Sequence, residues 1–249
     1  MKRSFTRARF GVIAAFAAAL AACATPPYVP TVYDAQASNV RSVVIADDAL
    51  PEGIGANELA SAMGTGAAAG GLIGTLTVAA MEATETRMRV GKLKELIEPT
   101  GFDPEAEFER ILAEKLALAG FEDTSVVSVE RRGRKHIDGV PDTQADAVLD
   151  TTMTFFGMQK AVTGEEWRPA AGVMVRLLDA DTGDTLMENV ISVNNGRVAT
   201  STREGIITVE PPADSVGYLK IKDMEADVVV ADMRAMLSTI ADNIVALLA

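Results

Sequence analysis

The sequence predicts an α+β fold, in which helices pack on one face of a small antiparallel or mixed sheet of about four to five strands. Two segments rich in β-branched and apolar residues, 172–178 and 185–193, flank a tight turn. Two other segments, 103–118 and 224–248, repeat apolar residues at helical spacing. With 48% hydrophobic and 23% charged residues, the composition is that of a folded globular protein.

The first predicted strand covers residues 39–46 (NVRSVVIA), which are compact and largely β-branched. Residues 47–55 contain a proline and two glycines and are predicted to turn. Residues 82–98 have the charged composition of a surface helix, and 99–101 (PTG) break it.

Residues 103–118 show the signals of a helix at both ends. Asp103 is a suitable N-cap, and Pro104 fits the first helical turn. Gly120 follows the last turn and is expected to end the helix. A broad apolar face connects these ends and consists of Phe108, Ile111, Leu112, Leu116 and Leu118.

The second half of the chain predicts a meander of strands and a closing helix. The hairpin turn at 179–184 (DADTGD) is the clearest turn signal in the sequence. The expected elements are a short strand at 121–130, a polar loop at 131–141, strands at 145–161, 172–178 and 185–193, an irregular stretch at 194–223 and an amphipathic helix at 224–248.

The amino terminus resembles the leader of a bacterial lipoprotein. Residues 1–9 carry four basic residues and no acid, and residues 10–22 form an apolar run too short for an ordinary membrane span. The run ends in Leu20, Ala21, Ala22 and Cys23, which resembles the lipobox of bacterial lipoproteins. The resemblance implies cleavage before Cys23 and lipid on its thiol. The alternative is a plain secretory signal with an incidental cysteine.

The predicted organisation is therefore a signal peptide at 1–22, a lipidated cysteine with an extended tether at 23–38, and one periplasmic domain at 39–249. Ala24 stands after the cysteine where an aspartate would retain an inner-membrane lipoprotein, which implies the outer membrane. Three prolines precede residue 31 and favour an extended tether that holds the domain off the bilayer.

A second resemblance concerns the domain itself. The order of its elements is similar to the periplasmic lipoprotein domains related to the curli-export lipoprotein and the TolB amino-terminal domain. The resemblance covers about residues 40–195 and 224–248, and its most specific piece is the turn Asp181-Thr182-Gly183. It implies a fold, with a self-assembling secretion-pore subunit as one possible function. The uncharged segment 59–81 does not show the alternating strands of a membrane barrel.

The segment 59–81 is rich in glycine and contains Gly66, Gly70 and Gly74 at intervals of four residues. On a helix, this spacing creates a flat face that another backbone can approach closely. The interpretation is a contact with a partner protein or a second copy; a flexible loop and membrane insertion are the alternatives. A nucleotide-binding loop is a poor fit, because no strand immediately precedes it.

A basic cluster at 131–136 (RRGRKH) stands out in an otherwise acidic chain. Its Arg131, Arg132 and Arg134 are candidates for contact with lipid phosphates or an acidic partner. The alternative is a solvated loop between two strands.

The overall charge and the scarcity of ligand residues exclude several functions. The formal net charge is −12; removing the four basic residues of the leader leaves 19 basic against 35 acidic residues, or −16. Such a chain repels nucleic acid. One cysteine and one histidine exclude an internal disulfide, a cysteine-rich zinc site and any multi-histidine metal centre. We expect no metal and no cofactor, and the spacing of Asp179, Asp181 and Asp184 fits a turn better than a calcium loop.

The expected function is a non-enzymatic, lipid-anchored component of the cell envelope, which binds an envelope protein or assembles with its own copies. Two alternatives belong to other classes. A hydrolase of cell-wall glycan would use Glu165 or Glu166 beside Trp167, and a lipid carrier would hold its ligand between sheet and helices. No recognisable catalytic serine or metalloprotease motif occurs in the sequence.

Overall fold

The fold is described from a computed structural model that covers residues 28–58, 85–160, 166–194, 205–212 and 217–249. The lipobox residues Leu20, Ala21, Ala22 and Cys23 lie outside the described residues. So do Gly66, Gly70 and Gly74 of the glycine segment, and Glu165. The predictions made for these residues therefore stay predictions.

The described residues form an α+β fold, as predicted, around one mixed sheet of seven strands. The sheet is larger than the four to five strands expected, because two short strands, β2 and β7, were missed. Neighbouring strands follow the order β3-β1-β4-β5-β6-β7, and β2 also pairs with β4. The strands are β1 (Val43–Ala46), β2 (Gly55–Glu58), β3 (Val126–Val127), β4 (Ala147–Lys160), β5 (Trp167–Asp179), β6 (Thr185–Val193) and β7 (Ile206–Val209).

Strand β4 is bordered on one side by two strands in succession. β1 pairs in parallel with the first three residues of β4, and β2 pairs in parallel with its last four residues. The backbones of Gly55 and Gly157 come so close that a Cβ on Gly157 would lie 2.0 Å from the carbonyl oxygen of Gly55. Gly55, which indicated a turn in the sequence, is thus part of a close strand pairing.

The predicted hairpin is confirmed in β5 and β6, which pair antiparallel along most of their length. Its turn is closed by the backbone N–H of Gly183, which donates to the carbonyl oxygen of Asp179 at 3.0 Å, and Gly183 adopts a φ of 76°. This backbone conformation favours glycine, which explains the residue at that turn position.

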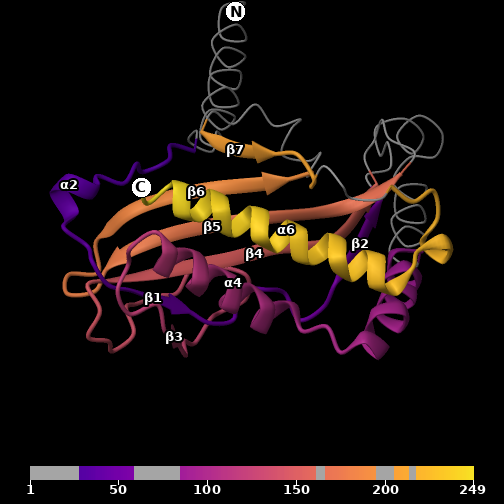
Figure 1. Ribbon diagram of the computed structural model, residues 1–249, viewed down its shortest axis with the longest axis horizontal. Coiled ribbons are helices and arrows are strands. Elements are labelled where there is room, and N and C mark those ends of the chain that lie inside the picture. Colours follow the sequence, from indigo (N-terminus) through magenta and orange to yellow (C-terminus); the bar gives the residue numbers. More distant parts are fainter. Residues whose placement is uncertain (1–27, 59–84, 161–165, 195–204, 213–216) are drawn as a thin grey trace, which may run out of the picture.

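Helices α4 (Pro104–Leu118) and α6 (Ala226–Ala246) lie side by side across one face of the sheet (Figure 1). The side chain of Asp103 accepts hydrogen bonds from the backbone N–H groups of Glu105 and Ala106, as its predicted role as N-cap requires. Buried apolar side chains of both helices, among them Phe108 and Met236, join those of β4, β5 and β6 in the main core. This packing places the two helices against one face of the sheet.

The segment predicted as a tether lies partly on the domain. The backbone N–H of Thr31 donates to the carbonyl oxygen of Glu188 in β6 at 2.9 Å, and Glu188 donates back at 3.0 Å. A short helix, α2 (Ala35–Ser38), follows and is capped by Asp34. Thr31 thus pairs with a sheet strand and residues 35–38 are helical, while the rest of the extended tether over 23–38 stays a prediction.

Three further features frame the end of the molecule where β4 finishes and β5 begins. Residues 85–97 are helical, as predicted, and continue into the 3-10 turn η1 (Glu98–Thr100). A second 3-10 turn, η2 (Ile221–Asp223), precedes α6 within the stretch predicted to be irregular.

Across the described ranges, every helix is too short or too polar to cross a membrane.

Candidate binding site

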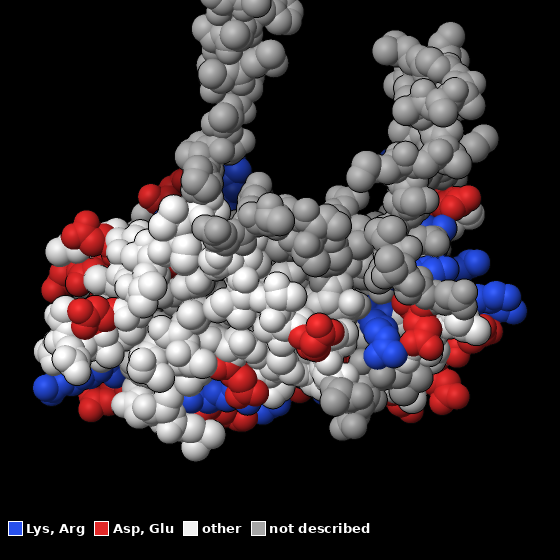
Figure 2. All heavy atoms as spheres, turned by 90° about the horizontal axis from the view of Figure 1, so that it is seen from above, with Lys and Arg blue, Asp and Glu red and all other residues white. Residues whose placement is uncertain are grey.

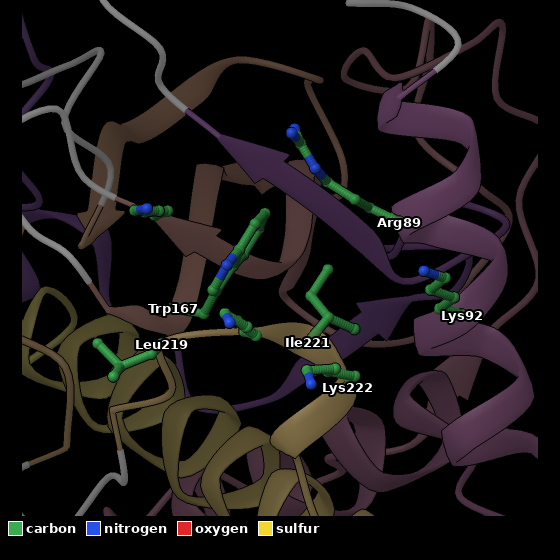
Figure 3. A pocket seen from close by; sticks show the side chains of 8 residues that line it. Arg89, Lys92, Trp167, Leu219, Ile221 and Lys222 are labelled. Atoms are coloured by element: carbon green, nitrogen blue, oxygen red, sulfur yellow. The ribbon is translucent and has the colours of Figure 1, made fainter.

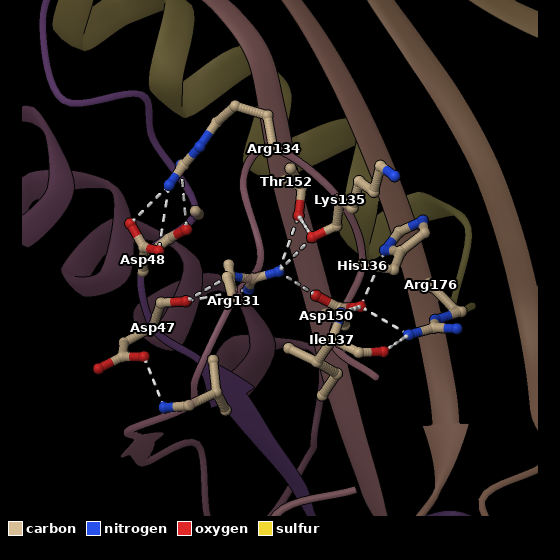
Figure 4. Close-up of polar contacts among 12 residues, drawn as sticks. Asp47, Asp48, Arg131, Arg134, Lys135, His136, Ile137, Asp150, Thr152 and Arg176 are labelled. Atoms are coloured by element: carbon tan, nitrogen blue, oxygen red, sulfur yellow. Dashed lines mark hydrogen bonds and ion pairs between the residues drawn. The ribbon is translucent and has the colours of Figure 1, made fainter. Parts of the chain in front are cut away.

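A buried carboxylate on β4, that of Asp150, lies at the centre of a network of hydrogen bonds and ion pairs. Asp150 has a fully buried side chain and receives an ion pair from Arg131 at 2.6 Å and another from Arg176 at 3.0 Å. The imidazole Nδ1 of His136 lies 2.8 Å from the same carboxylate, and the backbone N–H of Ile137 donates to it at 3.0 Å (Figure 4). We call these residues the Asp150 cluster.

Arg131 is held in place from several sides. Its guanidinium donates to the carbonyl oxygen of Asp47 at 2.9 and 3.0 Å, and to the hydroxyl of Thr152 at 2.7 Å. Its side chain is fully buried, like that of Asp150. The loop that follows β3 is thereby fixed onto the face of the sheet opposite the main core.

The ionisation of Asp150 reflects competition between burial and its partners. Burial acts to raise the pKa of this carboxyl group, whereas the hydrogen bond from His136 and the charge of Arg131 lower it. The partners prevail, and the pKa falls from 3.8 to about 2. The carboxylate is therefore ionised at any physiological pH.

The three arginines predicted as a contact surface have different environments. Arg131 is enclosed, so its side chain cannot reach a partner in the folded protein. Arg134 pairs with Asp48 at 2.9 Å and also donates to the carbonyl oxygen of Leu50. Arg132 is 91% exposed and lies 3.6 Å from Asp138. The alternative of a solvated loop does not describe Arg131, which is buried, and Arg132 is the open side chain among the three arginines.

A hollow of about 510 Å³ adjoins this loop, and its lining mixes charges of both signs, including Glu130, Arg132, Asp138 and Asp142. Its acids compete with any anion for the arginine, so this hollow offers little charge selectivity.

The carboxylate of Asp179 stabilises the hairpin turn by accepting hydrogen bonds within it. The carboxylate of Asp179 accepts from the backbone N–H of Thr182 at 2.8 Å, from its hydroxyl at 3.0 Å, and from the N–H of Asp181 at 3.1 Å. The N–H bond from Thr182 is the main reason that the pKa of Asp179 lies below its ordinary value. Within the described ranges, three or more possible metal-ligating side chains nowhere gather into a cluster.

Of the two carboxylates proposed for a hydrolase, Glu166 is described. It forms an ion pair with Arg168 at 2.8 Å, and both side chains are partly exposed. A surface ion pair of this kind accounts for Glu166 without a catalytic role.

A second basic group, which the sequence did not reveal, lines a cavity of about 430 Å³ at the end of the molecule described above. We call it the basic pocket (Figure 3). Among the described residues, its lining consists of five cations and three apolar side chains: Arg89, Lys92, Lys160, Lys220 and Lys222, with Trp167, Leu219 and Ile221.

Backbone pairing brings distant segments together at this pocket. Lys160, the last residue of β4, pairs with Trp167, the first residue of β5. Trp167 in turn exchanges two backbone hydrogen bonds with Tyr218, of 2.6 and 3.1 Å. The residues after Tyr218 are thereby placed beside the strand ends, and Lys220 and Lys222 line the same cavity as Lys160.

The helix at 85–97 forms another wall of the pocket. Leu93 and Ile97 are buried in the main core and fix this helix against the sheet. Lys92 and Arg89 extend from it into the space beside Trp167 (Figure 3). The guanidinium of Arg89 stands 5.8 Å from the centre of the indole ring, in cation–π distance, and also pairs with Glu85 at 2.9 Å.

Charges of both signs lie on the surface around this pocket. In the view of Figure 2, Lys and Arg side chains at the right-hand end of the face lie beside Asp and Glu side chains. Besides Glu85, Asp223 lies 3.9 Å from Lys222 and offsets part of the positive charge. In a chain of net charge −12, a cavity with five cations among its described lining residues is a distinct feature.

No protein-family model matches this sequence, and the search of curated proteins finds no match either. The resemblance to periplasmic lipoprotein domains accordingly stays a prediction. Conclusions about function depend on the residues and the geometry of this chain.

Proposed function

We propose that this protein is a lipid-anchored component of the bacterial cell envelope that acts by binding, not by catalysis. In this proposal Cys23 carries the lipid, and the domain faces the periplasm at the outer membrane. Its binding partner is a molecule of the envelope, and assembly with a second copy through the glycine segment is compatible with this role.

The observation that carries the binding role is the basic pocket. Five cations converge on one cavity around an indole, and together they provide the concave shape and charge that ligand recognition uses. The best candidates for catalytic carboxylates in the described chain have other partners: Asp150 is bound by its cluster and Glu166 by Arg168. These engagements favour binding over acid–base chemistry.

The proposed anchor keeps the domain near the membrane. Thr31 is fixed to β6, and the eight residues from Cys23 to Thr31 span at most about 29 Å even when fully extended. The acyl chains proposed on Cys23 would hold this short connection at the bilayer surface. Confinement of this kind raises the effective concentration of the domain for any ligand in the same membrane.

Replacing the proposed lipid acceptor tests the anchor. Cys23→Ser removes the thiol, so we expect the protein to leave the membrane fraction or to accumulate with its leader uncleaved. Fractionation and intact mass, compared with the control Thr25→Ser, measure this result. A Cys23→Ser protein that keeps the wild-type mass and stays membrane-bound after a salt wash contradicts the proposal.

The binding role is tested by crosslinking in the native envelope followed by identification of the crosslinked species. We expect a defined envelope component or a second copy of this chain. A protein that is exclusively monomeric and uncrosslinked, but cleaves cell-wall glycan in a Glu166-dependent manner, would support the hydrolase instead.

A further inference from the structure

We propose that the basic pocket binds a phosphate-bearing amphiphile, meaning a phosphate group joined to an apolar body. This inference names the ligand of the proposed binding role and rests on it. The anchor at Cys23 is a separate matter, because the pocket is built entirely by the folded domain.

The charge of the pocket selects an anion of more than one negative charge. Its cations come from three separate segments: Arg89 and Lys92 from the helix at 85–97, Lys160 from the end of β4, and Lys220 and Lys222 from the turn before α6. The fold holds these like charges together, and an anion between them lowers their repulsion. A phosphate presents several oxygens that can contact lysines and an arginine at once.

The floor of the pocket selects for an apolar body next to that anion. Trp167 is almost fully buried, and its indole lies beside Ile221 of the turn before α6 (Figure 3). Ile221 lines the same cavity. A cavity of about 430 Å³ lies within the range that small organic ligands occupy, which leaves room beyond a phosphate alone.

The rim of the pocket favours a membrane lipid as the source of this ligand. Leu219 lines the pocket between Tyr218 and Lys220 in the chain and is 60% exposed. Exposed apolar side chains beside lysines are typical of surfaces that rest on an anionic bilayer. A soluble phosphorylated metabolite has the same chemistry, so the experiment has one arm for each source.

Tryptophan fluorescence reports on this site alone, because Trp167 is the single tryptophan of the whole chain. In the soluble arm, the full-length protein in non-ionic detergent is titrated with hexyl phosphate. We expect a saturable change in emission. Inorganic phosphate, which lacks the apolar body, and hexanoate, which lacks the phosphate, should bind more weakly.

In the membrane arm, the full-length protein is reconstituted into phosphatidylcholine vesicles with or without phosphatidylglycerol. If a bilayer lipid occupies the pocket, phosphatidylglycerol changes the emission and weakens the binding of added hexyl phosphate. If hexyl phosphate binds but phosphatidylglycerol has no effect, the ligand is a soluble organophosphate. Both results support the proposed pocket.

Two lysines of one helix provide a matched comparison. Lys92 lines the pocket, whereas Lys94 is exposed on the same helix and does not. Lys92→Gln should weaken hexyl phosphate binding about fivefold, and Lys94→Gln should leave it nearly unchanged. The difference should shrink as the salt concentration rises.

The proposal is overturned if hexyl phosphate gives no saturable response, if Lys92→Gln and Lys94→Gln bind it equally, or if hexanoate binds as tightly. Displacement of hexyl phosphate by a lower concentration of poly-aspartate also overturns it, in favour of an acidic protein segment. None of these results changes the outcome of the Cys23→Ser fractionation, so the pocket and the anchor can fail independently.

Discussion

The two basic groups of this protein, the Asp150 cluster and the basic pocket, use the same residue types in opposite ways. In the cluster, Arg131 is fully buried and its guanidinium is surrounded by a carboxylate, carbonyl oxygens and a hydroxyl. In the pocket, five cations stand among the described residues that line an open cavity. The comparison shows that clustering in sequence is a poor guide to exposure in the fold.

The difference follows from what each group can reach. Arg131 lies over the strand that carries Asp150, so its charge is neutralised inside the protein. Lys92, Lys220 and Lys222 face a cavity whose floor is an indole and an isoleucine. The first arrangement stabilises the fold, and the second leaves charge for a ligand.

The largest effect that would sharpen this comparison is expected from Asp150→Ala. It leaves Arg131 buried without its carboxylate, so the free energy of unfolding should fall by about 3–5 kcal/mol. Urea unfolding followed by circular dichroism measures the loss. Asp138→Ala is the control, because its partner Arg132 is exposed, and it should cost less than about 0.5 kcal/mol. Equal losses for the two variants would show that the Asp150 cluster is not a stabilising element.

Acid should produce an intermediate effect through the same carboxylate. The folded-state pKa of Asp150 is about 2, below its ordinary value of 3.8, so ionised Asp150 stabilises the folded state above pH 4. This contribution, about 2 kcal/mol, should disappear progressively as the pH falls from about 4 to 2.

Asp150→Asn removes the titrating group and should flatten this part of the pH dependence. The measurement is the free energy of unfolding of both proteins at pH values from 2 to 6. If both proteins lose the same stability over this interval, the lowered pKa of Asp150 does not contribute.

The smallest effect on stability is expected in the basic pocket. Lys220→Gln removes one exposed like charge from the lining, so the free energy of unfolding should change by less than about 0.5 kcal/mol, with a slight gain from reduced repulsion. Thermal unfolding of the variant beside the wild-type protein measures this change. A loss as large as that of Asp150→Ala would mean that the pocket lysines are structural, and the contrast between the two groups would disappear.

Several elements could be predicted because their signals are local. The helix start at Asp103 and Pro104 depends on two adjacent residues and the N–H groups that follow them. The hairpin turn at Asp179 and Gly183 depends on hydrogen bonds within six residues. Such signals act over one turn of chain, so the sequence alone contains them.

The missed elements depend on distant partners. β2 has no strand-like composition and exists because Gly55 can approach Gly157, about a hundred residues away along the chain. The fixed position of Thr31 likewise needs Glu188 in β6. Pairings of this kind leave no periodic pattern in the short segment that joins the sheet. β7 is different, because Ile206–Val209 are all β-branched and carry a local strand signal within the stretch that was predicted to be irregular; it pairs in parallel with β6.

By itself, the sequence determined the α+β class, the two helices on the sheet, the hairpin and the basis for expecting a lipid on Cys23, since capping, turn and leader signals lie in short continuous stretches. The tertiary structure alone decided which cations are enclosed and which line a cavity. Arg131 was buried by a carboxylate on a neighbouring strand, and Lys92, Lys160 and Lys222 were gathered by pairing at the ends of β4 and β5. The solvation of a charge depends on everything packed around it, and that environment exists only after the chain has folded.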